Sequence, residues 1–286
     1  MNGSCGKITA GPWRPWLASL LVFTITTATC WAQDDETPTD TDDGTHPAKT
    51  LAAQAGDPTA PVLQFQVTNF LAPSSYNSDG YANLLNFQPV IPIQRTEKFP
   101  LSQVMRLTVP VITTPGPNRK TGLGDISFFD LFVPKPHSWG MWGAGVTMVT
   151  PTASNDELGQ GKWQLGPAAT LVYYKVPNWQ LGGVIQNPIS ITGDNNRASV
   201  STFQFQPLVN YLKGDWYFGV GDFNWTYDWK ANDWTIPFAF QAGRITRIGK
   251  HSYNLSVELA WTAVRPDNSV APKWGIRLGM VLMLPE

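Results

Sequence analysis

The stretch from His251 to Val264, HSYNLSVELAWTAV, alternates apolar and polar side chains almost without interruption. The apolar set is Tyr253, Leu255, Val257, Leu259 and Trp261. A period of two is the period of a β-strand, because successive side chains of a strand point to opposite faces. This segment is therefore predicted to be a strand with one apolar and one polar face.

The same alternation recurs along most of the chain in segments of about ten residues, the length expected of transmembrane β-strands. The predicted strands are 62–70, 83–94, 102–112, 124–133, 139–150, 162–175, 179–191, 201–212, 216–229, 234–245, 252–264 and 273–284. Two of them are irregular: Asp130 interrupts one, and the parity of another shifts near Gly219 and Gly221. We predict a β-bulge at both places.

The connections between these strands also alternate. They are long and polar after the first, third, fifth, seventh and eleventh strands, and short after the sixth, eighth and tenth. Those after the second and fourth are intermediate, and KAND after the ninth is a short exception. Outer-membrane barrels have long outer loops and short periplasmic turns, so the pattern favours such a barrel.

Tryptophans cluster near the predicted strand ends, where a ring with a polar N–H suits the boundary between hydrocarbon and headgroups. The candidates for two aromatic girdles are Trp139, Trp163, Trp179, Trp216, Trp229, Trp234, Trp261 and Trp274. The expected fold is all-β, a closed antiparallel up-and-down transmembrane barrel of about 12 strands over residues 61–286, closed because hydrocarbon offers no partner for a free strand edge. A secreted soluble β-sandwich would also alternate and is the competing interpretation.

The chain begins like a secretory signal peptide, with Lys7 and Arg14 before a short apolar run. We predict that residues 1–32 are removed by cleavage near Ala32 and that the mature protein is located in the bacterial outer membrane. A lipoprotein with Cys30 at its new terminus is the alternative. Cys5 and Cys30 are the only cysteines, so cleavage after Ala32 leaves none for disulfides, thiol catalysis or metal binding.

Residues 33–60 are acidic and rich in Pro and Thr, with almost no large apolar side chain. Such a segment buries too little surface to offset the entropy of ordering, so we predict a flexible tail. The formal net charge of −1 gives no indication of a nucleic-acid partner.

The sequence gives little support for an enzyme, because no histidine lies in the middle of a predicted strand beside a nucleophile. We predict no catalytic, cofactor-binding or metal-binding residues. The polar residues on the inward parity are candidates for lining the lumen: Arg106, Lys162, Gln164, Gln186, Gln204, Asn210, Asp222, Asn224, Glu258 and Arg277. They either set the selectivity of a pore or fill the lumen with hydrogen-bonded pairs, and Glu258 and Arg277 lie on adjacent strands where they can pair.

Three stretches, TGLGDISFFDLF, PTASNDELGQGKWQLGPAA and TYDWKANDWTIPF, occur in this order in the chain. Together they resemble the bacterial MetA-pathway of phenol degradation family of outer-membrane barrels, over most of residues 62–286. The matching residues are Gly124, Asp125, Gly159, Lys162, Trp163, Gly166, Pro167, Tyr227, Asp228, Trp229 and Trp234. The resemblance implies an outer-membrane location and uptake of small, often apolar or aromatic, compounds, and it supplies no catalytic residues.

A twelve-stranded barrel lies between the filled eight-stranded and the channel-forming sixteen-stranded barrels. We therefore expect a narrow path for small molecules, obstructed by an inward loop or by the acidic tail, with outer-membrane lipid as the surrounding partner. The alternatives are a structural barrel whose long outer loops bind a partner, and a barrel enzyme that acts on lipid. The solute and the oligomeric state stay open at this point.

Overall fold

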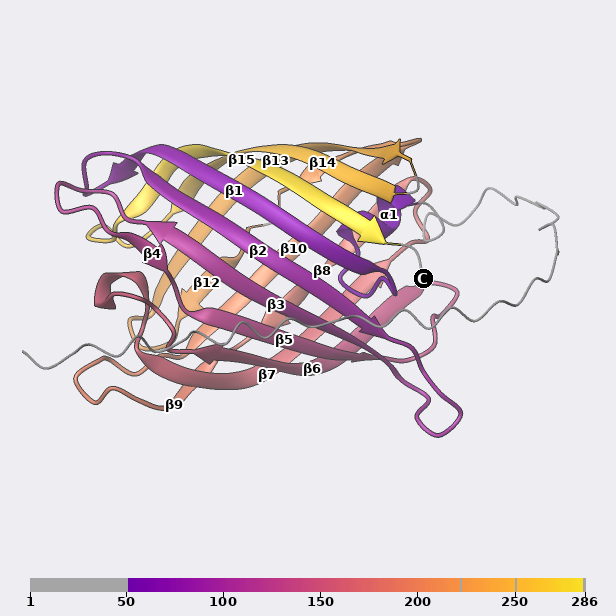
Figure 1. The fold of residues 1–286 in the computed structure, drawn as a ribbon, viewed down its shortest axis with the longest axis horizontal. Coiled ribbons are helices and arrows are strands. Elements are labelled where there is room, and N and C mark those ends of the chain that lie inside the picture. Colours follow the sequence, from indigo (N-terminus) through magenta and orange to yellow (C-terminus); the bar gives the residue numbers. More distant parts are fainter. Residues whose placement is uncertain (1–50, 222, 250, 285–286) are drawn as a thin grey trace, which may run out of the picture. The chain divides into compact units, whose positions relative to one another are not determined.

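The strands form one closed antiparallel barrel in the computed structural model, which describes residues 51–221, 223–249 and 251–284 (Figure 1). The predicted signal peptide and residues 33–50 of the predicted tail lie outside the described residues. The strands are β1 (Leu63–Tyr76), β2 (Ala82–Ile93), β3 (Ser102–Thr113), β4 (Thr121–Leu123), β5 (Ile126–Val133), β6 (Gly140–Thr150), β7 (Lys162–Tyr173), β8 (Trp179–Gln186), β9 (Ile189–Gly193), β10 (Thr202–Lys213), β11 (Trp216–Val220), β12 (Trp225–Asp228), β13 (Asp233–Ile248), β14 (His251–Val264) and β15 (Ala271–Leu284).

Three pairs of short strands each occupy a single position in the wall: β4 with β5, β8 with β9, and β11 with β12. The barrel therefore has 12 positions, as the sequence predicts. Pairing of β10 with β8 and of β15 with β1 leaves no free edge in the described sheet. Closure matters because an open edge would expose unpaired N–H and C=O groups.

The exposed fractions of the side chains show which face of each strand lies inside the barrel. Leu255, Val257 and Leu259 are exposed on the outer surface, whereas Glu258 between them is 4% exposed and points into the lumen. A soluble sandwich would bury the apolar set instead, so that interpretation is wrong. The apolar face of β14 therefore lies outward and its polar face lies inward.

The two predicted bulges have different outcomes. Between β11 and β12 the pairing with β10 changes from Asn210↔Gly219 to Gln204↔Thr226, a shift of one residue, so this prediction is confirmed.

The bulge predicted at Asp130 is wrong, because β5 pairs with β3 without any register shift. Asp130 lies between buried Phe129 and Leu131 and so faces outward. Gln103 Nε2 donates a hydrogen bond of 2.8 Å to its carboxylate. This neighbour on β3 binds one of the two carboxylate oxygens, and Asp130 stays on the outward face of a regularly paired strand.

The two ends of the barrel differ, and we name them by their contents. The long-loop end carries the connections 114–120, 151–161, 194–201 and 265–270, and 151–161 includes a 3₁₀ turn, Asp156–Leu158. The α1 end carries short turns, such as 174–178 and 214–215, and the helix α1 (Leu51–Gly56) (Figure 1). No helix in the described part of the chain is long and apolar enough to cross a membrane.

Of the three apolar clusters among the described residues, one lies inside the barrel at the α1 end. Buried Ala53 and Ala55 of α1 pack with side chains of the inner wall, namely Leu212, Tyr217, Ile245, Val281 and Met283. Residues 51–60, which the sequence assigned to the flexible tail, are thus α1 and the turn that follows it, held within the lumen. We call residues 51–60 the plug. Its small side chains gave no sign of a core, but the wall around them supplies the apolar surface that they lack.

Candidate functional site: the lumen

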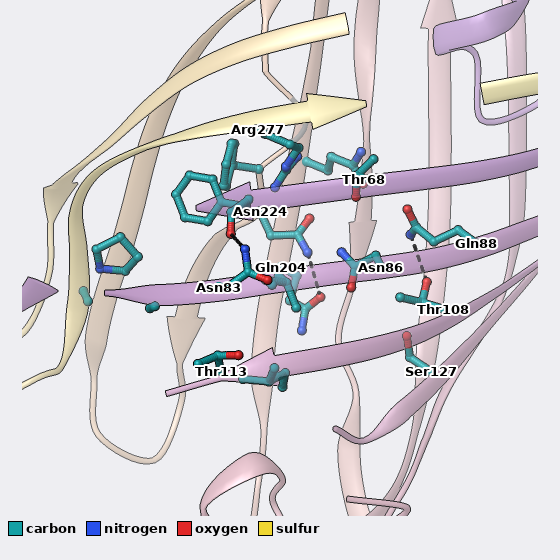
Figure 2. Close-up of a pocket in the computed structure, with 18 of the residues that line it drawn as sticks. Thr68, Asn83, Asn86, Gln88, Thr108, Thr113, Ser127, Gln204, Asn224 and Arg277 are labelled. Atoms are coloured by element: carbon teal, nitrogen blue, oxygen red, sulfur yellow. Dashed lines mark hydrogen bonds between the residues drawn. The ribbon is translucent and has the colours of Figure 1, made fainter. Parts of the chain in front are cut away.

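A cavity of about 690 Å³ occupies the lumen towards the long-loop end, and we call it the vestibule (Figure 2). Amide side chains are prominent in its lining: Asn83, Asn86, Gln88, Gln186, Gln204, Gln206 and Asn224. Apolar side chains lie among them: Phe70, Leu84, Ile112, Val149 and Phe223. The vestibule therefore offers neutral hydrogen-bonding groups and apolar surface, beside the guanidinium groups of Arg106 and Arg277.

Hydrogen bonds between neighbouring strands fix several of these amides (Figure 2). Gln88 Nε2 donates to Thr108 Oγ1 at 3.0 Å across β2 and β3. Asn224 Nδ2 donates to Gln204 Oε1 at 3.4 Å. Each bond uses only part of an amide's capacity for donors and acceptors, so the lining can also bind a solute.

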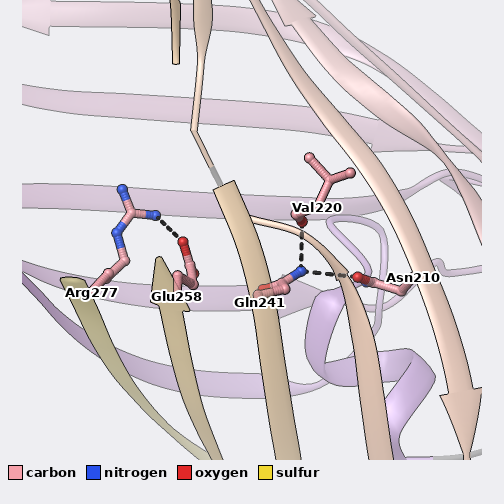
Figure 3. Close-up of polar contacts among 5 residues, drawn as sticks. All are labelled: Asn210, Val220, Gln241, Glu258 and Arg277. Carbon is pink, nitrogen blue, oxygen red and sulfur yellow. Dashed lines mark hydrogen bonds and ion pairs between the residues drawn. The ribbon is translucent and has the colours of Figure 1, made fainter. Parts of the chain in front are cut away.

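On the side of the vestibule that faces the α1 end, a buried ion pair joins β15 to β14 (Figure 3). Arg277 Nη1 lies 3.3 Å from Glu258 Oε2, which confirms the predicted pairing. The Arg277 guanidinium carbon lies 3.7 Å from the centre of the Phe223 ring, a distance at which cation–π attraction is effective. We call this narrow level the waist. Burial of both charges makes each one depend on the other.

A second cavity, of about 110 Å³, lies at the waist. It shares Thr68, Arg106 and Gln206 with the vestibule, so these three residues border both cavities. Gln241 Nε2 donates to Asn210 Oδ1 at 2.9 Å and to the Val220 carbonyl at 2.8 Å along its wall (Figure 3).

The plug closes this second cavity towards the α1 end. Gly56 and Pro58 of the plug line the cavity. Gln180 Nε2 donates to the Ala53 carbonyl at 3.0 Å. A Cβ added to Gly56 would lie only 3.0 Å from Asn210 Nδ2, so the plug fits closely against β10. Hydrogen bonds from the wall thus satisfy part of the helix backbone.

Asp57 anchors the plug. Its carboxylate accepts hydrogen bonds from Thr59 N at 2.8 Å, from Thr59 Oγ1 at 2.5 Å and from the Tyr174 hydroxyl. Burial raises the pKa of Asp57 above its ordinary value, although these donors oppose the rise. Burial and the nearby carboxylate also raise the pKa of Tyr174 far above its ordinary value, so its hydroxyl keeps its proton and remains a donor.

The structure brings most of the predicted lumen residues together. Arg106, Gln186, Gln204, Asn224 and Arg277 line the vestibule, and Arg106, Asn210 and Glu258 line the second cavity. Two others lie apart from both cavities. Lys162 Nζ donates to the Asp194 carbonyl at 2.6 Å at the long-loop end, and Gln164 donates to Gln160 Oε1 at 2.5 Å. Asp222 lies outside the described residues.

Sequence reasoning missed the polar residues of β2 and the anchor of the plug. Asn86 and Gln88 alternate with Leu85 and Phe87, so their parity was a signal that they face inward. Asp57 had no comparable signal, because its partner Tyr174 is 117 positions away.

The predicted girdle tryptophans lie near the two ends of the barrel. Seven are exposed: Trp163, Trp179, Trp216, Trp229, Trp234, Trp261 and Trp274. Trp139 is half-buried and stacks on His137, with 5.4 Å between ring centres. Trp142 is also exposed and was not predicted. Among the described residues, no group of three or more His, Cys, Asp or Glu side chains could hold a metal ion.

A closed barrel with an apolar outer wall and a polar lumen defines the class of membrane-spanning β-barrel proteins. The structure is similar to the COG4313 outer membrane channel from Pseudomonas putida F1, with a TM-score of 0.58 and 14% identity over 78% of this chain and 96% of that chain. This neighbour confirms the predicted resemblance to the phenol degradation family at the level of the fold.

A second similarity is weaker. Outer membrane phospholipase A from Escherichia coli has a TM-score of 0.39 and 11% identity over 78% of this chain and 92% of that chain, too low to carry an argument. No family model matches the sequence, and no curated protein matches it.

Proposed function

We propose that this barrel lies in the outer membrane and gives small molecules passive passage through its lumen. The observation that carries the proposal is the succession of two cavities along the lumen, the vestibule and the second cavity, which border on the same residues Thr68, Arg106 and Gln206. A purely structural barrel would gain stability by filling that space with side chains.

Small apolar or aromatic compounds that carry a hydrogen-bonding group are the solutes that we propose. Phe70, Ile112 and Phe223 offer apolar surface, and the neighbouring amides offer donors and acceptors without a net charge. The similarity in fold to a channel supports passage, and the resemblance to the phenol degradation family supports this solute class.

Passage through to the α1 end requires the plug to move or to loosen, because it closes the second cavity. Its contacts suit such a movement. Small side chains and a few hydrogen bonds hold it, whereas continuous strand pairing holds the wall.

Catalysis is not part of this proposal. The described histidines, His137 and His251, are exposed at the α1 end, and neither lines the vestibule. A candidate general base must reach the proton that it abstracts.

The test is transport by purified, folded protein, with folding checked as a band shift on boiling in detergent gels. Planar bilayers and proteoliposomes would be given phenol, benzyl alcohol, glucose and ions. We expect faster entry of the two aromatic alcohols than of glucose relative to protein-free liposomes. Folded protein that passes none of these solutes, even without its plug, would contradict the proposal and favour a barrel that binds a partner through its loops. Phospholipid hydrolysis by that protein would favour the enzyme.

A further inference from the structure

Two basic side chains flank a tryptophan on the outer wall at the α1 end. Lys213 of β10 pairs with Trp216 of β11, and Trp216 pairs with Arg244 of β13. All three are exposed, and the Arg244 guanidinium carbon lies 5.3 Å from the Trp216 ring centre. Directly opposed residues in antiparallel strands have Cβ atoms about 5 Å apart, so the three side chains form one row across the wall.

An apolar groove of about 640 Å³ begins beside this row. Phe218 continues from Trp216 along the same face of β11, and the two rings stack with their centres 6.2 Å apart. Val209, Tyr211 and Phe240 line the groove with Phe218. The groove runs from the row of charges towards the middle of the barrel wall, which is the path of an acyl chain in a bilayer.

Of the described residues, no carboxylate lies within ion-pair distance of Lys213 or Arg244. Asp215 lies in the turn between Lys213 and Trp216, where its backbone carbonyl accepts from Ile245 N at 2.8 Å. The α1 end also exposes Lys98, Lys135, Lys175 and Arg247. Among these basic residues, Lys213 and Arg244 are the pair that opens onto the groove.

We propose that Lys213, Trp216 and Arg244, together with this groove, bind one anionic glycerophospholipid. The phosphate lies between the two cations, the glycerol lies against the indole ring, and one acyl chain follows Phe218 and Phe240. This inference rests on the proposed membrane location and is independent of transport. Its physical basis is the attraction of basic residues to anionic lipids and the preference of tryptophan for the interface.

The test measures lipid binding to folded protein in detergent by native mass spectrometry, with titration of phosphatidylglycerol and, separately, phosphatidylcholine. We expect one phosphatidylglycerol to bind in preference to phosphatidylcholine. The double variant Lys213→Gln with Arg244→Gln should bind it about twenty-five-fold more weakly, because each basic residue near an anionic surface contributes about fivefold. Lys135→Gln with Lys175→Gln removes the same charge from the same end and should leave the affinity unchanged.

Two further arms separate the sources of the phosphate. Dihexanoyl phosphatidylglycerol should bind more weakly than the dioleoyl lipid, and inorganic phosphate should not displace the lipid. Equal losses in both double variants, no preference of the original protein for the anionic lipid, or displacement by phosphate alone would each overturn the site. Conductance of the Lys213→Gln, Arg244→Gln protein should be unchanged, so a failure here is distinguishable from a failure of the proposed passage.

Discussion

The long-loop end and the α1 end of the lumen are built from the same strands but have different contents. At the long-loop end, amides and scattered apolar side chains surround an open vestibule of about 690 Å³. At the α1 end, inward side chains such as Leu212, Ile245 and Met283 are apolar and pack against the plug. Alternation alone does not distinguish the two ends, because both present the inward parity of the same strands.

The difference shows that the residue type at inward positions decides what fills a barrel of this size. Amides at the long-loop end remain satisfied beside water or a solute. Apolar inward residues at the α1 end would be exposed to water in an empty lumen, and burying them is favourable. The plug therefore folds where the wall offers apolar surface, and the ion pair of Glu258 and Arg277 marks the boundary.

Removal of the plug should have the largest effect on this comparison. Replacement of residues 51–60 by a flexible Gly/Ser linker should make the two ends alike and raise single-channel conductance more than any other change proposed below. The measurement is conductance in planar bilayers at fixed salt. Shortening of the loop 265–270 at the other end is the matched control and should change conductance little. Equal conductance with and without the plug would show that the plug does not close the lumen.

Breaking the ion pair at the boundary should have the next largest effect. Arg277→Leu leaves Glu258 buried without its ion-pair partner and should lower the free energy of unfolding by about 3–5 kcal/mol. Glu258→Leu with Arg277→Leu should recover most of that loss, because no unpaired charge remains. Urea titrations followed by the band shift on gels measure both. A double variant as unstable as the single one would show that the pair does not act as a unit.

The anchor of the plug should respond to pH. Because the folded pKa of Asp57 lies above 3.8, the docked plug binds more protons than the released plug between those two pKa values. Its docking free energy is therefore fully present below pH 3.8 and weakens as pH rises through the folded pKa. The open probability in bilayers should rise over the same range.

Three variants sharpen this prediction. Asp57→Asn should flatten the pH profile, and Asp215→Asn, at an exposed acid of the same end, should leave it intact. Tyr174→Phe removes a hydrogen bond to the Asp57 carboxyl group and should weaken docking by about 1 kcal/mol. A pH profile of Asp57→Asn identical to that of the original protein would assign the titration to another group.

The smallest effect should come from the vestibule. Gln88→Leu removes the bond to Thr108 and should cost about 1 kcal/mol of unfolding free energy, with little change in conductance. It should shift uptake towards solutes without a hydrogen-bonding group, such as toluene relative to phenol. Thr246→Val, a polar-to-apolar change at the α1 end, is the control. If Gln88→Leu changed conductance more than deletion of the plug does, the expected ranking of the two ends would be reversed.

Much of the fold was predictable because its signal is local. The alternation in 252–264 needs no distant partner to be recognised, and the predicted pairing of Glu258 with Arg277 followed from two such strands. The lumen was only partly predictable. Asn86 and Gln88 share the inward parity of their strand, but parity does not reveal which inward residues border a cavity.

The sequence by itself determined the strands and their alternating apolar and polar faces, since a period of two is recognisable within about ten residues, and it placed the tryptophans near the strand ends. The tertiary structure alone decided that residues 51–60 enter the lumen and that Asp57 meets Tyr174. A short segment of small residues has too little apolar surface to order itself, and its stability comes from a wall assembled from strands distant in the chain. The contacts that close the α1 end are therefore absent from any local pattern.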